Sequence, residues 1–243
     1  MSEFTIKDRI LDEQNIYSAI FCLESYVFDK GLLDTETPVV VKDENKIEFL
    51  AQNDLELYYA LSDKHNMVLI EKVIGLCTEQ LKAMFADPSK LFTIKVYFKL
   101  KSYDEKILKF RPLHTARLID LICMVSILIP LMYDDDYAKG KRSLSDLSKL
   151  LPHNFYGNIP STNVQYLFHK WQTKYKEYSD NVIEHCRTYQ KNHNYLTEVS
   201  LDIKNFFPSI SPKMLYNYIV DKLSLTYKED PDTCLLYTSL SPR

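Results

Sequence analysis

The chain has 243 residues, of which 46% are hydrophobic and 26% are charged, and its formal net charge is -3. This balance is typical of a globular protein and excludes an intrinsically disordered chain. Only four residues are glycine, and they do not form a glycine-rich phosphate-binding loop.

The charges are distributed unevenly along the chain. Residues 1–90 carry 9 basic and 17 acidic side chains, whereas residues 91–243 carry 21 and 16. We therefore expect a polyanion to bind the second part. The five cysteines lack a Cys-x-x-Cys pair and the N-terminus lacks an apolar signal core. Both features favour a reducing, cytoplasmic environment.

The N-terminal part contains the patterns of several helices and one short strand. Apolar residues at helical spacing predict helices over residues 13–30, 47–61 and 68–85. Residues 39–41, which are three valines, predict a strand or an extended segment. Nothing in residues 1–90 indicates a particular chemistry. We interpret this part as a scaffold, with an acidic partner-binding surface as the alternative.

In residues 92–113 the hydrophobic pattern changes from helical spacing to a period of two. Ile94, Val96 and Phe98 alternate with lysines and a tyrosine, and after a polar turn the return strand repeats the alternation. This pattern predicts a β-hairpin with basic side chains on one face. From Lys95 to Arg117 the chain has seven basic and two acidic residues. That surplus predicts either a solvated strand face or a surface that binds a polyanion.

The most apolar run of the sequence extends from Leu118 to Met132. It is too short for a membrane span and contains Asp120 and Pro130, so it predicts a buried helix and no contact with a membrane. After it, residues 139–148 are polar and predict a loop that enters a short helix.

Two segments follow before the next strand. Tyr156-Gly157-x-x-Pro160 by itself predicts a turn with a packing tyrosine. Residues 162–190 predict a long helix, and we expect its aromatic side chains to serve core and helix packing, with a base-stacking platform as the alternative. These aromatic residues are Tyr166, Trp171, Tyr175 and Tyr178.

The chain is organised around Val199 to Ile210, where a short apolar strand leads into Asp202. Ser211 and Pro212 follow at the positions of an N-cap and a first helical residue. Asp202 is therefore predicted at the C-terminal end of a strand, before a turn into a helix. A carboxylate there is a good oxygen ligand for Mg2+, which suits phosphoryl-transfer chemistry.

These segments resemble blocks of bacterial reverse transcriptases, the group that includes group II intron, retron and phage-defence enzymes. Residues 199–210 resemble motif A. Residues 111–113, Arg-Pro-Leu, together with Asp120, which lies nine residues after Arg111, resemble the end of the fingers hairpin. Residues 156–160 resemble the block before motif A, although Ile159 replaces the usual arginine. The three blocks occur in the order of the family.

The resemblance implies an α/β fold that is an incomplete right-hand polymerase, with the fingers and the first strand and helix of the palm. Residues 1–92 would be the N-terminal helical part of the fingers, and residues 93–195 the fingers with the basic hairpin. Residues 196–233 would begin the palm. Residues 234–243 resemble the translation of a sequencing adapter, from which only Leu240 departs. We therefore expect the native part of this chain to end near residue 233 and the last ten residues to be an artefact of library preparation.

The resemblance also implies roles for individual residues. Asp202 would be catalytic and bind Mg2+, helped by the carbonyl group of Ile203, and Phe207 would lie under the sugar of the incoming nucleotide. Arg111 would contact that nucleotide, and a lysine of the first hairpin strand would contact its triphosphate. The remaining expected contacts are Lys99 or Lys101 for the triphosphate, Asn205 and Phe206 for the nucleotide, and Tyr156 and Gly157 for template or primer.

The activity implied by the resemblance is that of an RNA-directed DNA polymerase. It would use an RNA template, a DNA or RNA primer and deoxynucleoside triphosphates. Within the family, the sequence slightly favours a phage-defence enzyme. The stretch Met132 to Tyr137 fits Tyr-x-Asp-Asp, the second catalytic motif of the family, but it lies before Asp202. We interpret it as a charged helix end and loop, and expect the chain as given not to polymerise. The alternatives are a non-catalytic nucleic-acid-binding or partner-binding protein with a polymerase-like fold, and an unrelated helical protein.

Overall fold

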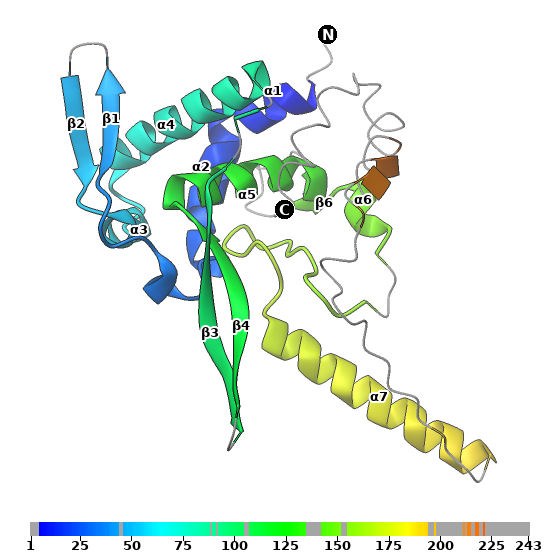
Figure 1. Cartoon of the computed structure of the whole chain (residues 1–243). Coiled ribbons are helices and arrows are strands. Elements are labelled where there is room, and N and C mark those ends of the chain that lie inside the picture. The colour runs from blue at the N-terminus through cyan, green and yellow to red at the C-terminus, as the bar shows by residue number, and fades with distance from the viewer. Residues whose placement is uncertain are drawn as a thin grey trace.

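The computed structural model describes residues 5–43, 46–87, 89–90, 92–104, 107–134, 142–151, 155–193, 197, 211, 213–214, 217–218 and 221. Helices and small two-stranded antiparallel sheets make up this part of the chain (Figure 1). The mixture of helix and strand is consistent with the α/β class expected from the sequence.

The helices are α1 (Ile6–Leu11), α2 (Glu13–Phe21), α3 (Asp54–Ser62), α4 (Met67–Ala86), α5 (Leu118–Met132), α6 (Asp146–Lys149) and α7 (Trp171–His193), with short 3-10 turns η1 (Leu23–Ser25) and η2 (Lys30–Leu32). The strand pairs are β1 (Val39–Asp43) with β2 (Lys46–Ala51), β3 (Ile94–Asp104) with β4 (Ile107–Ala116), and β5 (Tyr133–Asp134) with β6 (Ser143–Leu144). The strand near residue 40, the helix near 68–85, the hairpin and the apolar helix are therefore confirmed.

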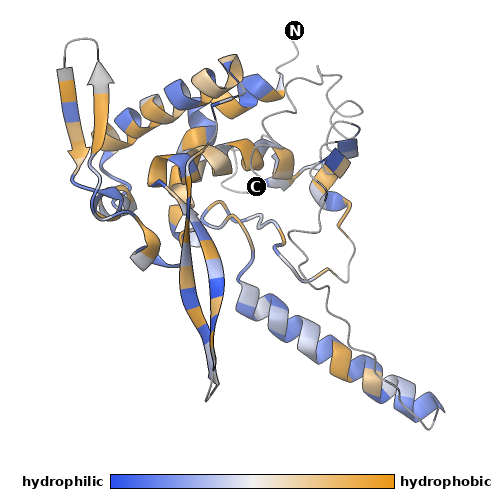
Figure 2. Ribbon diagram, in the orientation of Figure 1, coloured by the Kyte–Doolittle hydropathy of each residue, from blue (hydrophilic) through white to orange (hydrophobic). Residues whose placement is uncertain are grey.

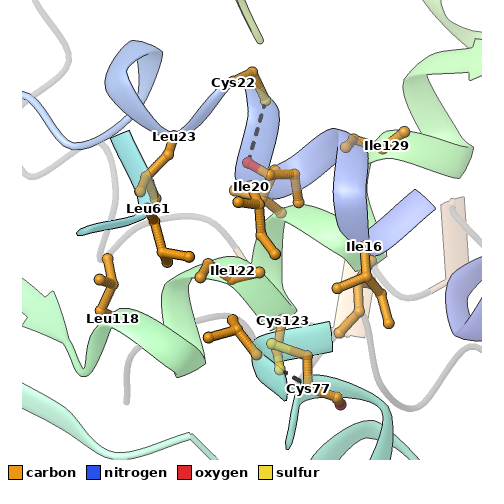
Figure 3. Packing of buried hydrophobic residues seen from close by; sticks show 14 of the residues in the cluster. Ile16, Ile20, Cys22, Leu23, Leu61, Cys77, Leu118, Ile122, Cys123 and Ile129 are labelled. Atoms are coloured by element: carbon orange, nitrogen blue, oxygen red, sulfur yellow. Dashed lines mark hydrogen bonds between the residues drawn. The ribbon is translucent and has the colours of Figure 1, made fainter. Parts of the chain in front are cut away.

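The hydrophobic core surrounds α5, which packs against α1, α2 and α4. Figure 3 shows Ile122 of α5 lying among the aliphatic side chains of α2 and α3. Cys22, Cys77 and Cys123 are buried in the same core. This single cluster draws on residues 6–92 and on residues 118–167, so the two expected parts of the fingers share one core.

Helix α5 confirms the buried helix predicted for the apolar run. The Asn15 side chain, only 3% exposed, donates hydrogen bonds to the carbonyl groups of Ile10 at 3.2 Å and Ser126 at 2.8 Å. These bonds tie the corner between α1 and α2 to the middle of α5. Within the described ranges, no helix combines the length and the apolar character that a membrane crossing needs.

A buried ion pair connects α3 to the beginning of α5. The Arg117 guanidinium donates from Nε to Asp54 Oδ2 at 2.8 Å and from Nη2 to Asp54 Oδ1 at 2.9 Å. The backbone N–H of Leu118 also donates to Asp54 Oδ2, at 3.0 Å. Arg117 occupies the N-cap position of α5 without a cap of its own, so the carboxylate of Asp54 replaces the missing cap. The hydrogen bonds from the guanidinium to Asp54 raise the pKa of Arg117.

Two predicted N-terminal helices are wrong in their extent. The helix expected over residues 13–30 ends at residue 21, because the Ser25 hydroxyl donates to the carbonyl of Cys22 at 2.6 Å and favours a 3-10 turn. The helix expected over residues 47–61 divides into β2 and α3. The Asn53 side chain accepts the N–H of Glu56 at 2.9 Å, and the Glu56 carboxylate accepts the N–H of Gln52 at 2.7 Å. This capping arrangement starts a new helix there.

The long helix expected over residues 162–190 begins at residue 171 instead. The preceding segment is a loop that folds back on itself, in which the N–H groups of Ser161 and His169 donate to the carbonyl groups of Leu167 and Ile159. The Ser25 hydroxyl accepts the N–H of Leu167 at 2.9 Å. Because these backbone groups are bonded to distant partners, they are not available for a helix.

Arg117→Met and Asp54→Asn should each lower the free energy of unfolding, the first by about 3 kcal/mol or more, because it leaves the fully buried Asp54 carboxylate without its counter-ion. Urea unfolding followed by circular dichroism measures this change. Asp63→Asn, a change of the same charge at an exposed position between α3 and α4, is the control and should cost less than about 0.5 kcal/mol. Equal stability of all three variants would contradict the assigned role.

Candidate functional site

The β3–β4 hairpin extends away from the helical core, and hydrophilic and hydrophobic residues alternate along it (Figures 1 and 2). Residues directly opposite each other in an antiparallel pair share a face, and neighbours along a strand alternate between faces. Lys99 lies opposite Arg111, and Ser102 lies opposite Lys109. The register shifts between residues 100 and 102, so Lys101 occupies a bulge.

One face of the hairpin is therefore basic, as the sequence predicted. We call it the basic face, and its charged residues are Lys95, Lys99, Lys109 and Arg111, with Lys101 at the bulge. Within the described part of the chain, Lys101, Lys109 and Arg111 are exposed and have no ion-pair partner. The end of the hairpin farther from the core thus presents the unpaired cations.

The opposite face of the hairpin is apolar and exposed. Each of its large side chains is more than half exposed, although a strand face of this kind usually packs against another layer. The residues of this apolar face are Val96, Phe98, Leu100, Tyr103, Leu108 and Phe110. The hairpin is therefore amphipathic, with cations on one side and aromatic and aliphatic side chains on the other.

Acidic residues of the N-terminal part pair with the basic face near the core. Asp34 accepts a hydrogen bond from the Lys95 ammonium at 2.6 Å, and Asp29 accepts one from Lys99 at 3.1 Å. Asp34 also accepts the backbone N–H groups of Glu36 and Thr37. The Lys95 bond, together with these N–H groups, holds the pKa of Asp34 far below its ordinary value.

Asp120 lies in the first turn of α5 and is largely buried. Its carboxylate accepts a hydrogen bond from the Gln80 side chain at 2.5 Å, and burial raises its pKa. The aspartate that follows Arg-Pro-Leu in the sequence thus joins α5 to α4 and does not lie on the basic face. Its position is that of a packing residue at the base of the hairpin.

Tyr156 and Gly157 lie beside α7. The Tyr156 hydroxyl accepts a hydrogen bond from the Asn181 side chain at 2.6 Å, and its ring packs edge-on against Tyr178 with centroids 5.6 Å apart. A Cβ atom at Gly157 would come within 2.8 Å of the Phe155 ring, so this glycine permits the ring to pack over the turn.

Helix α7 has no buried residue, so the prediction that its aromatic side chains pack in the core is wrong. Packing at the helix surface is present, since the Tyr178 ring lies against Tyr156 and Tyr175. Trp171 is 61% exposed and Tyr175 is 63% exposed. The aromatic side chains recur at helical spacing, but the helix extends away from the core (Figure 1) and most of its residues are hydrophilic (Figure 2). A helix that leaves the body of the protein exposes its apolar side chains together with its polar ones.

Tyr133 of the Tyr-x-Asp-Asp-like stretch is buried, and its hydroxyl donates to the carbonyl of Leu167 at 2.6 Å. Helix α5 ends at residue 132 just before it, which agrees with the expected helix end. The Arg142 guanidinium lies over its ring, 4.8 Å from the centroid. Tyr133 is therefore a core residue that anchors the connection before α7.

The predicted motif A lies outside the described residues. This applies to Asp202, Ile203, Asn205, Phe206 and Phe207. The helix expected after them is described in part, since the N–H of Met214 donates to the Ser211 hydroxyl at 3.4 Å. Ser211 thus has the expected N-cap role. In the described ranges, no group of three His, Cys, Asp or Glu residues could hold a metal ion.

The sequence patterns did not identify Asp29, Asp34 or Asp54 as partners of the basic residues. Local signals were present, because Asp29 accepts the N–H of Gly31 and Asp34 that of Glu36, two residues along the chain in each case. Such contacts are typical of aspartates in turns. They do not indicate that the carboxylates lie beside a hairpin more than sixty residues later.

We found no match to a protein-family model, to a curated protein or to a solved structure. The resemblance to reverse transcriptases therefore depends on the motifs of this chain alone.

Asp34→Asn should reduce the loss of stability in acid. Because the folded pKa of Asp34 is depressed, the group stabilises the fold above its unfolded pKa, and this contribution is lost as the pH falls below about 4. The free energy of unfolding should therefore decrease less steeply between about pH 5 and pH 3 in the variant. Urea unfolding at several pH values measures the slope. A slope equal to that of the original protein would contradict the Lys95 pairing.

Phe98→Thr together with Phe110→Thr should change the free energy of unfolding by less than about 0.5 kcal/mol for each site, because both rings are more than half exposed. The same double variant should bind less of a hydrophobic dye and associate less with itself. Dye fluorescence and analytical ultracentrifugation measure these effects. A large loss of stability would show that the apolar face is covered within the monomer.

Proposed function

We propose that this chain supplies the fingers and the first part of the palm of an RNA-directed DNA polymerase. The observation that supports the proposal most is the placement of Arg111. This residue of the Arg-Pro-Leu block is exposed on the basic face, directly opposite Lys99 and without an ion-pair partner among the described residues. A guanidinium free to bind phosphate oxygens is what the role of this block requires.

The proposed reaction is attack of a primer 3′-hydroxyl on the α-phosphate of a deoxynucleoside triphosphate. A bond forms between the 3′-oxygen and the α-phosphorus, and the bond to pyrophosphate breaks. Arg111 would donate hydrogen bonds to the phosphate oxygens and stack on the base. A lysine of β3, either Lys99 or Lys101, would neutralise part of the triphosphate charge.

The proposed catalytic carboxylate is Asp202, with the carbonyl of Ile203 as a further Mg2+ ligand and Phe207 under the sugar. Bound Mg2+ would stabilise the charge that develops on the transferring phosphoryl group. The N-cap bond of Ser211 supports the part of this proposal that concerns the following helix, because it places a helix start immediately after the Phe-Phe-Pro-Ser-Ile segment.

Tyr156 and the aromatic side chains of α7 support a role in holding single-stranded template or primer. Base stacking on exposed aromatic rings contributes about 1–3 kcal/mol per base. Trp171 and Tyr175 are exposed, and Tyr178 is in contact with Tyr156. The base-stacking alternative for these residues thus becomes the preferred proposal.

A second candidate is a non-catalytic nucleic-acid-binding protein with the same fold. The amphipathic hairpin favours it, because unpaired cations and exposed aromatic rings bind single strands without requiring metal-dependent chemistry. A role in defence against phage is compatible with either candidate.

Long-read sequencing through codon 233 and beyond in the source genome distinguishes the candidates. The polymerase proposal expects the reading frame to continue into an apolar strand, Tyr-x-Asp-Asp and a second apolar strand. A frame that ends at Arg243 would contradict it and would favour the binding protein.

In the protein encoded by the continued frame, Asp202→Ala should reduce Mg2+-dependent primer extension to background. Arg111→Ala should raise the KM for the nucleotide about tenfold or more, since a hydrogen bond to a charged group contributes about 1.5–3 kcal/mol. Lys82→Ala, which removes an exposed cation of α4, is the control and should leave extension unchanged. Unchanged extension by Asp202→Ala would refute the assignment of motif A.

A further inference from the structure

We propose that the Asp29 carboxylate forms an ion pair with Lys99 until a polyphosphate displaces it. Through this competition, Asp29 sets the affinity of the basic face for nucleotides. This inference rests on the proposed function, because it concerns the same phosphate-binding face. It assigns a role to a residue of the N-terminal scaffold, for which the sequence indicated no chemistry.

Three aspartates pair with basic residues at the base and along the basic face, and their burial decreases with distance from the core. The Asp54 side chain, paired with Arg117, is 0% exposed. The Asp34 side chain is 7% exposed, and the Asp29 side chain is 42% exposed. Exposed ion pairs are much weaker than buried ones. The first two pairs therefore fix the hairpin to the core, and the pair formed by Asp29 is the one that an external anion can replace.

The ion pair between Asp29 and Lys99 lies next to the unpaired cations of the basic face. Lys99 lies opposite Arg111 on the same face, and the side chains of directly opposed residues approach within a few ångströms. An anion that contacts both side chains must approach the carboxylate of Asp29, which carries the same sign of charge and accepts a hydrogen bond from Lys99. The carboxylate therefore competes with the ligand directly.

A second feature lies on the same face. Tyr97 precedes Lys99 by two residues, and its hydroxyl group is buried without a hydrogen-bond partner among the described residues. A buried donor without an acceptor costs free energy. A phosphate oxygen could accept from this hydroxyl group only after the atoms that cover it have moved, so the hydroxyl would favour the exchange further only in that case.

The Asp29 side chain also makes a second hydrogen bond, which does not depend on its pairing with Lys99. Its Oδ1 atom accepts the N–H of Gly31 at 3.2 Å, whereas its Oδ2 atom accepts from Lys99 at 3.1 Å. Loss of the lysine bond thus leaves the turn at η2 capped by the same side chain. An amide at this position keeps the oxygen that caps the turn, so Asp29→Asn removes the charge while it preserves the local structure.

Binding of inorganic tripolyphosphate to the full chain, measured by isothermal titration calorimetry without metal, tests the proposal. Asp29→Asn should increase the affinity about two- to fivefold, which corresponds to about 0.4–1 kcal/mol, the range of an exposed ion pair. Asp63→Asn is the matched control, because Asp63 also accepts the N–H of a residue two positions later and loses the same charge. It should change the affinity much less than Asp29→Asn.

A double-mutant cycle separates competition by Asp29 at Lys99 from a general effect of charge. Lys99→Met should weaken tripolyphosphate binding, and Asp29→Asn should give no further increase in the Lys99→Met background. An equal increase from Asp29→Asn and Asp63→Asn would overturn the role of Asp29, as would an increase that persists without Lys99. Circular dichroism of each variant verifies that it is folded.

The two proposals fail in different ways. If tripolyphosphate binds and Arg111→Gln weakens binding while Asp29→Asn has no effect, the phosphate-binding face stands and the role of Asp29 is wrong. If the folded chain and the Asp29→Asn variant both fail to bind tripolyphosphate, the phosphate-binding role of the face is wrong and the role of Asp29 falls with it.

Discussion

The hairpin and the central helix depend on the buried pair between Asp54 and Arg117. One carboxylate accepts two guanidinium bonds and the first free N–H of α5, so it fixes the point where β4 ends and α5 begins. Because Asp54 is the first residue of α3, this point is tied to the N-terminal helices. The direction in which the hairpin leaves the core follows from this contact, together with the packing of α5 between α2 and α4.

The exposure of the hairpin follows from its two faces. Among the described residues, the aspartates of the N-terminal part that pair with Lys95 and Lys99 contact the basic face near the core. The apolar face receives no such cover among the described residues and remains exposed. This asymmetry relates the acidic charge of the N-terminal part to the basic charge of the hairpin, because the carboxylates of the first part neutralise the lysines of the second part that lie nearest the core.

Local patterns determined the elements whose residues interact mainly with their sequence neighbours. The alternation of polar and apolar residues predicted the β3–β4 hairpin and the separation of its basic and apolar faces. The continuous apolar run predicted α5. Errors arose where a local contact competed with a longer pattern. The cap formed by Asn53 and Glu56 interrupted an apparent helix, and the hydroxyl of Ser25 ended another. These short polar contacts are specific in geometry and carry little signal in hydrophobic periodicity.

For the candidate site, the sequence by itself determined which residues form the basic face, because the alternation along the hairpin places Arg111 and the lysines on one side. It did not determine which of them are already paired. Only the tertiary structure placed Asp29 beside Lys99 and left Arg111 without a counter-ion among the described residues, because those distances join segments far apart in the chain. The same is true of α7, whose aromatic pattern is compatible with a buried or an exposed helix. Burial depends on what lies beside an element in space, and a sequence pattern specifies only the face that would be buried.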